Sequence, residues 1–199
     1  MKKSTAGSSE KNTLRFKPLT TVNWKDLETL FGEKGACGGC WCMTWRMAAK
    51  EYALLKGDKN KKRFYELVRK KEPLGILAYI NGSPVGWCSV SPKQKLLELK
   101  NSRILQRTDT NNTWSIICLF VEKAFRRQNI SARLIEAAAA YAKAGGAVVV
   151  EAYPVIPTHK NMPDVFAYTG IWKAYEKAGF SILMKNSPGK YIMQKKVQA

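Results

Sequence analysis

The chain has 199 residues, of which 45% are hydrophobic and 25% charged, the composition of an ordinary globular protein. A chain of this length buries roughly 70% of its unfolded surface, so it needs no disulfide or metal to fold. Lys and Arg number 34 against 15 Asp and Glu, and the formal charge of +19 attracts polyanions such as nucleic acid, acidic lipid or a phosphorylated cofactor. No run approaches the roughly 18 apolar residues of a membrane span, which predicts a cytoplasmic protein without membrane contact.

The N-terminal third predicts a disordered segment followed by mostly helical structure. Residues 1–13 are polar and without apolar periodicity, so we expect them to be disordered and residues 14–199 to form a single domain. Asn23 is a candidate N-cap for a helix that carries Trp24, Leu27 and Leu30. The other predicted elements are an edge strand at residues 14–18, a flexible glycine break at 35–39, and helices over 41–55 and 60–72.

The rest of the chain predicts a sheet with one crossover helix. Asn81-Gly82 between two apolar runs, residues 75–80 and 84–90, indicates a β-hairpin. Residues 114–121 and 147–152 read as buried strands on either side of a helix at 130–144 that ends at Gly145-Gly146. A strand, helix and strand in this order require parallel pairing and a right-handed connection. A short helix at 171–177 and strands at 180–184 and 191–194 complete the expected elements.

The junction between the strand at 114–121 and the helix at 130–144 is a candidate anion site. A helix N-terminus has unpaired N–H groups and a partial positive charge, and Arg126, Arg127 and Arg133 add full charges around it. Charge alone favours a different interpretation, in which these arginines are simply a solvated rim of the helix.

This junction resembles the GNAT superfamily of acyl-CoA-dependent N-acetyltransferases, and the resemblance covers residues 14–196. The family pattern is Arg/Gln-x-x-Gly-x-Gly/Ala after an apolar strand, and this chain has Arg126-Arg127-Gln128-Asn129-Ile130-Ser131. Asn129 and Ser131 stand where glycines are usual; asparagine tolerates positive φ and serine is small, so the loop can keep the shape of a pyrophosphate nest. A second match is Tyr175-Glu176-Lys177-Ala178-Gly179-Phe180, similar to the segment that ends the last helix of the family.

The resemblance implies a mixed α/β (α+β) fold with a mostly antiparallel sheet, splayed at one parallel strand pair and covered by helices on both faces. It also implies that acetyl-CoA lies in this splay, with a β-bulge near Leu119 that leaves backbone groups free for the pantetheine arm. The implied cofactor-binding residues are Leu119, Phe120, Val121, Arg126, Arg127, Gln128, Asn129, Ile130, Ser131 and Ala132.

Two residues are implied as catalytic. The family tyrosine, here Tyr175, protonates the departing thiolate of CoA; without the resemblance it reads as a core tyrosine with a wet hydroxyl. Glu151 matches a strand glutamate that some family members use as the general base, and its alternative is a carboxylate at the wet edge of the strand. His159, the only histidine, lies in the loop at 153–170 and is a second candidate for the base. An ordinary surface histidine is the simpler interpretation.

The cysteines Cys37, Cys40 and Cys42 form a compact motif, and Cys88 and Cys118 lie on separate apolar strands. A structural zinc site requires four ligands, so we expect no metal. A redox pair is the second interpretation of the motif, and a glycine-hinged loop that presents Trp41 and Trp45 near the acceptor pocket is the third.

Two functions from different classes follow. The first is transfer of an acetyl group from acetyl-CoA to an amine on a small molecule or protein, by direct attack in a ternary complex, by a monomer or homodimer. The second is a basic module that binds nucleic acid or the ribosome through residues 56–72, which carry a net charge of +5. The sequence has no recognisable nucleic-acid motif, and it does not identify the acceptor.

Overall fold

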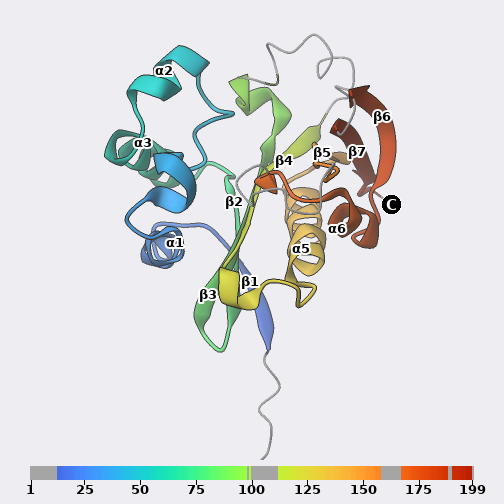
Figure 1. The fold of residues 1–199 in the computed structure, drawn as a ribbon, viewed down its shortest axis with the longest axis horizontal. Coiled ribbons are helices and arrows are strands. Elements are labelled where there is room, and N and C mark those ends of the chain that lie inside the picture. The colour runs from blue at the N-terminus through green and yellow to red at the C-terminus, as the bar shows by residue number, and fades with distance from the viewer. Residues whose placement is uncertain (1–12, 98, 100–111, 158–166, 188–189, 199) are drawn as a thin grey trace, which may run out of the picture.

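A computed structural model describes residues 13–97, 99, 112–157, 167–187 and 190–198. The predicted disordered segment therefore lies, except for Thr13, outside the described residues. Within the described part of the chain, seven strands form one sheet in the order β1-β2-β3-β4-β5-β7-β6 (Figure 1). The strands are β1 Leu14–Pro18, β2 Gly75–Ile80, β3 Ser83–Pro92, β4 Thr113–Val121, β5 Val149–Ala152, β6 Ser181–Ser187 and β7 Lys190–Lys196.

The sheet is antiparallel at every neighbouring pair except β4 and β5, which are parallel. The parallel pair is joined by helix α5 (Ile130–Ala144), so the predicted strand-helix-strand unit is confirmed with the predicted helix bounds. The predicted hairpin is also confirmed: Asn81 and Gly82 between β2 and β3 have φ angles of 49° and 82°, the left-handed backbone that an Asn-Gly turn favours.

Helices cover both faces of the sheet (Figure 1). Helices α1 (Trp24–Phe31), α2 (Ala49–Leu54) and α3 (Asp58–Arg69) lie on one side, and α5 and α6 (Trp172–Lys177) on the other. Along β2, Ile76 and Ala78 enter the core beneath α5, while the alternating Leu77 and Tyr79 enter the core beneath α1 and α3. A strand buried on both faces reads as an unbroken apolar run, which explains the sequence of β2. The fold is the mixed α/β architecture that the sequence predicts.

The helix predicted over residues 41–55 is wrong in its first half. Only α2 is helical, and residues 41–47 form successive turns. Trp41 and Cys42 have φ angles of 41° and 56°, which no α-helix accommodates. Trp41 packs between Trp24 and Phe31. The helix-like spacing of apolar residues therefore comes from side chains that successive turns bury in the core.

Asn23 occupies the position before α1, but it does not cap the helix with its side chain. Its amide bonds the N–H of Thr20 and the carbonyl of Pro18, and so holds the turn between β1 and α1. Among the described helices, none combines the length and the apolar character needed to cross a membrane.

Candidate functional site

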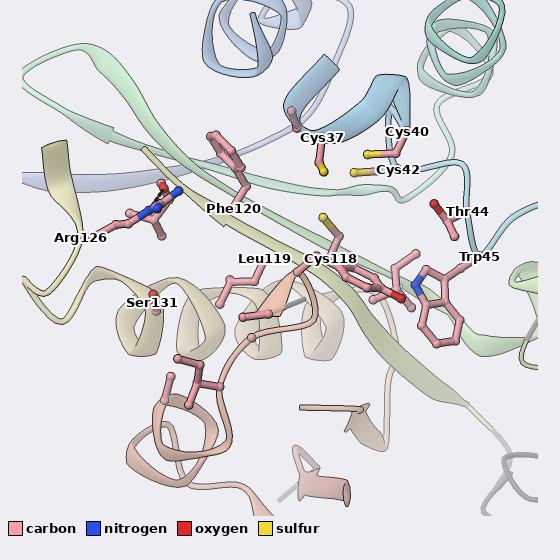
Figure 2. Close-up of a pocket in the computed structure, with 18 of the residues that line it drawn as sticks. Cys37, Cys40, Cys42, Thr44, Trp45, Cys118, Leu119, Phe120, Arg126 and Ser131 are labelled. Carbon is pink, nitrogen blue, oxygen red and sulfur yellow. Dashed lines mark hydrogen bonds between the residues drawn. The ribbon is translucent and has the colours of Figure 1, made fainter. Parts of the chain in front are cut away.

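A cavity of about 650 Å³ lies where β4 ends and α5 begins (Figure 2). One wall is β4 from Ile117 to Val121, and Arg126 and Ser131 close the end near α5. The opposite walls come from residues 36–45 with Tyr52, and from residues 167–174. Three stretches far apart in the sequence, within residues 36–52, 117–131 and 167–174, therefore enclose one space.

The β4 wall is irregular at the point where the cavity begins. Cys118 pairs with Ser89 of β3 but Ile116 pairs with Val90, so Ile117 is an extra residue and forms a β-bulge. The parallel ladder to β5 stops at Ile116 opposite Ala152, where β5 ends, and β4 continues to Val121 without a parallel partner strand. The bulge predicted near Leu119 is thus confirmed. One expected free group is taken, because the Leu119 N–H donates to the carbonyl of Tyr168 at 2.7 Å.

The loop before α5 has the left-handed backbone of a nest. Asn129 has φ 60° and ψ 12°, and Arg127 has φ 61°, so asparagine fills the position where a glycine is usual. Asn129 makes no side-chain cap bond, which leaves the first N–H groups of α5 to an anion. The guanidinium of Arg126 donates to the Val121 carbonyl at 2.9 Å and so ties the loop to the end of β4.

Half of the ten predicted cofactor residues line the cavity. These are Leu119, Phe120, Val121, Arg126 and Ser131. The other five, Arg127, Gln128, Asn129, Ile130 and Ala132, belong to the loop before α5 and its first turn. Ile130 and Ala132 are buried in the core, so any contact they make with a ligand falls to their backbone, whereas Arg127, Gln128 and Asn129 are exposed.

Tyr175 lies just behind the cavity wall. Its side chain is fully buried, and its hydroxyl donates to the Thr169 carbonyl at 2.7 Å. Gly170, which lines the cavity with φ 88°, separates the tyrosine from the cavity: a Cβ there would be 2.8 Å from the Tyr175 ring and 3.2 Å from Leu119. Burial raises the pKa of the Tyr175 hydroxyl well above its ordinary value, so the group is held in its protonated form.

Glu151 is not at the cavity. It is fully buried on β5, where Lys93 forms an ion pair with it at 2.9 Å. Tyr153 donates to it at 2.9 Å and Gln194 at 2.7 Å. The network approaches the cavity through Tyr153, whose ring stacks on Trp45, a lining residue, with ring centroids 5.8 Å apart.

Thiols and aromatic rings form the end of the cavity remote from Arg126. The lining residues are Cys37, Cys40, Cys42, Thr44, Trp45, Tyr52, Cys118 and Tyr168. Trp45 was expected at the pocket and is there, whereas Trp41 is 2% exposed and buried in the core. The sequence does not predict that Tyr52 and Tyr168 line this cavity, or that Cys118 approaches the cysteine motif. A local sequence pattern does not show which distant segments meet in the fold.

The Cys42 side chain is only 4% exposed and lies among hydrogen-bond donors. The indole N–H of Trp87 donates to its sulfur at 3.1 Å. Hydrogen bonding with Cys118, the Trp87 donor and the charge of Arg46 together hold the pKa of Cys42 below its ordinary value despite burial. The pKa of Cys118 is raised well above its ordinary value by the same hydrogen bond and by burial, so this thiol stays protonated.

Among the described residues, no three His, Cys, Asp or Glu side chains are arranged to hold a metal ion. His159, the other candidate base, falls within residues 158–166 and so lies outside the described part of the chain.

The family model described as "Acetyltransferase (GNAT) family" matches residues 41–180. This match includes Cys42, the β4–α5 junction and the Tyr175 segment, and it begins after Cys37 and Cys40. No curated protein is significantly similar to the chain.

Several solved structures have the same fold. They include PaiA N-acetyltransferase from Thermoplasma acidophilum in complex with coenzyme A, which is 16% identical with a TM-score of 0.53 and aligns 93% of this chain with 99% of its own. The putative acetyltransferase YncA from Salmonella typhimurium with acetyl-CoA is 12% identical (TM-score 0.55; 94% and 95% covered). The aminoglycoside acetyltransferase AAC(6')-Ib in complex with coenzyme A is 14% identical (TM-score 0.54; 92% and 95% covered). At these identities the likeness establishes the fold alone.

Proposed function

The chain belongs to the GNAT family of acetyltransferases, which use acetyl-CoA, and we propose that it transfers the acetyl group to an amine by direct attack within a ternary complex. The observation that carries the proposal is the cavity that runs from the N-terminal loop of α5 to the bulge of β4. One end offers backbone N–H groups and Arg126 to an anion, and the other is an apolar chamber. This polarity suits a cofactor with a pyrophosphate at one end and a thioester at the other.

Acetyl-CoA is proposed to bind with its pyrophosphate at Arg126–Ser131 and its pantetheine arm along Leu119, Phe120 and Val121. The left-handed Asn129 supports the first contact, because it turns successive N–H groups toward the loop interior. The end of β5 opposite Ile116 supports the second, because it leaves this edge of β4 without a neighbouring strand. The thioester would then lie close to Cys118 and Leu119.

The proposed chemistry has two proton transfers. The amine nitrogen attacks the thioester carbon, the C–N bond forms, and the C–S bond breaks as the sulfur leaves. Tyr175 is the proposed acid that protonates this sulfur. Its hydroxyl is held protonated and lies behind Gly170, which forms the cavity wall. To reach the sulfur, the hydroxyl must leave the Thr169 carbonyl and turn past Gly170, where no side chain blocks it.

Glu151 is the proposed acceptor of the amine proton, acting through Tyr153. The Tyr153 hydroxyl donates to the Glu151 carboxylate and contacts the Ser115 hydroxyl at 3.0 Å, so a proton that reaches Tyr153 has a hydrogen-bonded route to the carboxylate. The ring stack on Trp45 places Tyr153 beside the cavity wall. The Lys93 and Gln194 contacts fix the carboxylate at the end of this route.

The acceptor is proposed to be an amine on an apolar or aromatic body, either a small molecule or a protein group. Trp45, Tyr52 and Tyr168 supply aromatic surface, and none of the described residues that line the cavity is a carboxylate. The net charge of +19 opposes attraction of a polycation at long range.

The test is a panel of acceptors that contains arylamines, aliphatic amines, a polyamine, an aminoglycoside and peptides with free N-termini. Mass spectrometry would measure acetylated product and released CoA, with heat-denatured protein as the blank. Turnover with an apolar or aromatic amine above the polyamine supports the proposal. Acetyl-CoA binding without transfer to any primary amine would contradict the amine assignment.

A further inference from the structure

Two cysteines 76 positions apart, Cys42 and Cys118, meet in the cavity wall. Figure 2 shows the Cys118 sulfur pointing from β4 toward the side of the cavity that carries Cys37, Cys40 and Cys42. Cys42 is held there by two successive left-handed residues, Trp41 and Cys42 itself, neither of which is glycine. A backbone of this kind is costly and is concentrated at functional sites.

The surroundings of Cys42 stabilise a thiolate. The Trp87 indole approaches the sulfur to 3.1 Å as a donor, and Cys118 is a second hydrogen-bonding partner. Arg46 is buried, and its guanidinium bonds the hydroxyls of Ser89 and Ser91, which carry no charge. An anionic sulfur at Cys42 therefore adds to Glu72 as a source of negative charge near this buried cation.

The other three cysteines lack this environment. Cys37 is exposed, and burial raises the pKa of Cys40 above its ordinary value. Cys88 belongs to the core beneath α5 and does not line the cavity, and burial raises its pKa too. Spacing alone favours Cys37 and Cys40 as a redox pair, whereas the contacts favour Cys42 and Cys118.

We propose that Cys42 is a covalent modification site for low-molecular-weight disulfides, with Cys118 as the resolving thiol. A thiolate beside a protonated second cysteine, at the wall of a cavity large enough for a small molecule, is the arrangement that thiol–disulfide exchange requires. The disulfide of CoA is the favoured ligand; this preference, but not the exchange chemistry, rests on the proposed function.

The exchange balances in two steps. The Cys42 thiolate attacks one sulfur of the ligand disulfide, that S–S bond breaks, and a mixed disulfide forms while one ligand thiolate leaves and takes up a proton. Cys118 then loses its proton and attacks the Cys42 sulfur, which expels the second ligand thiol and forms a Cys42–Cys118 disulfide. Two protein thiols are oxidised and one ligand disulfide is reduced to two thiols.

The resulting bridge would join the segment after residue 40 to the bulge of β4. These are the two walls between which the thioester is proposed to lie, so oxidation should lower acetyl transfer, and a dithiol reductant should restore it.

The experiment uses the full chain, reduced and then exposed at pH 7 to CoA disulfide or to oxidised glutathione. Intact mass and peptide mapping would follow the adducts. In the parent protein we expect loss of two hydrogens and a Cys42–Cys118 peptide pair; in Cys118→Ser we expect one trapped ligand moiety on Cys42. We expect the adduct to form on Cys42, whose sulfur accepts from Trp87 and lies beside Cys118, in preference to the more exposed Cys37.

The matched control is Cys37→Ser, which removes an exposed thiol from the same cavity and should leave the reaction at Cys42 unchanged. Circular dichroism would verify that Cys42→Ser and Cys118→Ser fold. Equal reaction of Cys37 and Cys42, or a Cys37–Cys40 bridge as the first product, would overturn the proposal.

The two ligands separate this proposal from the proposed function. If glutathione disulfide modifies Cys42 while acetyl-CoA does not bind, the thiol site stands and the cofactor assignment fails. If acetyl-CoA binds and is used, but neither disulfide modifies Cys42, the thiol site fails and the acetyltransferase assignment stands.

Discussion

At the scale of single residues, the site depends on what glycine and asparagine allow the backbone to do. Gly170 has φ 88°, and a Cβ there would lie 2.8 Å from the Tyr175 ring and 3.2 Å from Leu119, so the site has no room for a side chain. Asn129 has φ 60° and replaces a glycine without loss of the left-handed turn before α5. The second feature follows from the sequence, because asparagine tolerates this region; the first does not, because the partners of Gly170 come from elsewhere in the chain.

The first prediction compares two glycine replacements with similar backbones. Gly170→Ala and Gly146→Ala both force alanine to a φ near 90°, and each should lose about 1–2 kcal/mol of unfolding free energy. Gly146 has open space around the new Cβ, whereas at Gly170 the Cβ meets Tyr175 at 2.8 Å. Denaturant unfolding should therefore show a further loss of roughly 1 kcal/mol for Gly170→Ala, together with weaker acetyl-CoA binding. Equal losses and equal binding would mean that this position does not confine the cavity.

The second prediction concerns Tyr175→Phe. Removal of the buried hydrogen bond to Thr169 should reduce the unfolding free energy by about 1 kcal/mol and leave acetyl-CoA affinity nearly unchanged. If the hydroxyl protonates the leaving sulfur, kcat should fall by roughly 10²–10⁴-fold in single-turnover measurements with an accepted amine. Full single-turnover activity would rule out Tyr175 as the essential acid.

At the scale of elements, β5 is held to its neighbours by a buried polar network as well as by its ladder. Lys93, from the turn after β3, pairs with Glu151 on β5, and Gln194 on β7 bonds the same carboxylate. The exposed fractions of the Lys93 and Glu151 side chains are 4% and 0%, so the pair is excluded from water. Removing one partner of such a pair leaves the other as an uncompensated buried charge, which is strongly destabilising.

The third prediction is a double-mutant cycle with Lys93→Met and Glu151→Gln. Each single variant should lose roughly 3 kcal/mol of unfolding free energy, and the double variant should show a coupling of about 1–3 kcal/mol. The cycle also tests catalysis. If Glu151 accepts the amine proton, Glu151→Gln should lower kcat/KM for an accepted amine more than Lys93→Met, which keeps the carboxylate. Equal losses in both folded variants would limit Glu151 to a structural role.

The strands and the crossover helix could be predicted from the sequence because their signals are local. Residues 130–144 carry their own period and a glycine end, and Asn81-Gly82 specifies its own turn. The segment at 41–47 could not be predicted, since Trp41 and Cys42 adopt left-handed angles that only packing against Trp24, Phe31 and Trp87 sustains. The approach of Cys118 to Cys42 could not be predicted for the same reason, since it also depends on packing between segments that are distant in the sequence.

At the scale of the whole molecule, the +19 charge has two candidate uses, an anionic cofactor or a nucleic acid. The basic stretch at residues 56–72 includes α3, but Lys61, Arg63 and Arg69 form ion pairs with Glu28, Glu51 and Glu66. These pairs lower the charge that this surface presents to a polyanion. The loop at Arg126, in contrast, combines a cation with the N-terminus of a 15-residue helix at the mouth of a cavity.

Isothermal titration calorimetry with acetyl-CoA, and with mixed-sequence RNA and DNA at two salt concentrations, tests most directly whether the cavity binds acetyl-CoA. We predict saturable binding of one acetyl-CoA per chain with a dissociation constant on the order of 1 μM to 1 mM, the usual range for an enzyme and its substrate. Any nucleic-acid binding should fall by about 10³-fold or more between about 50 and 200 mM salt, whereas acetyl-CoA binding should persist. Folded protein that binds nucleic acid but gives no saturable heat with acetyl-CoA would contradict the assignment of the cavity to acetyl-CoA.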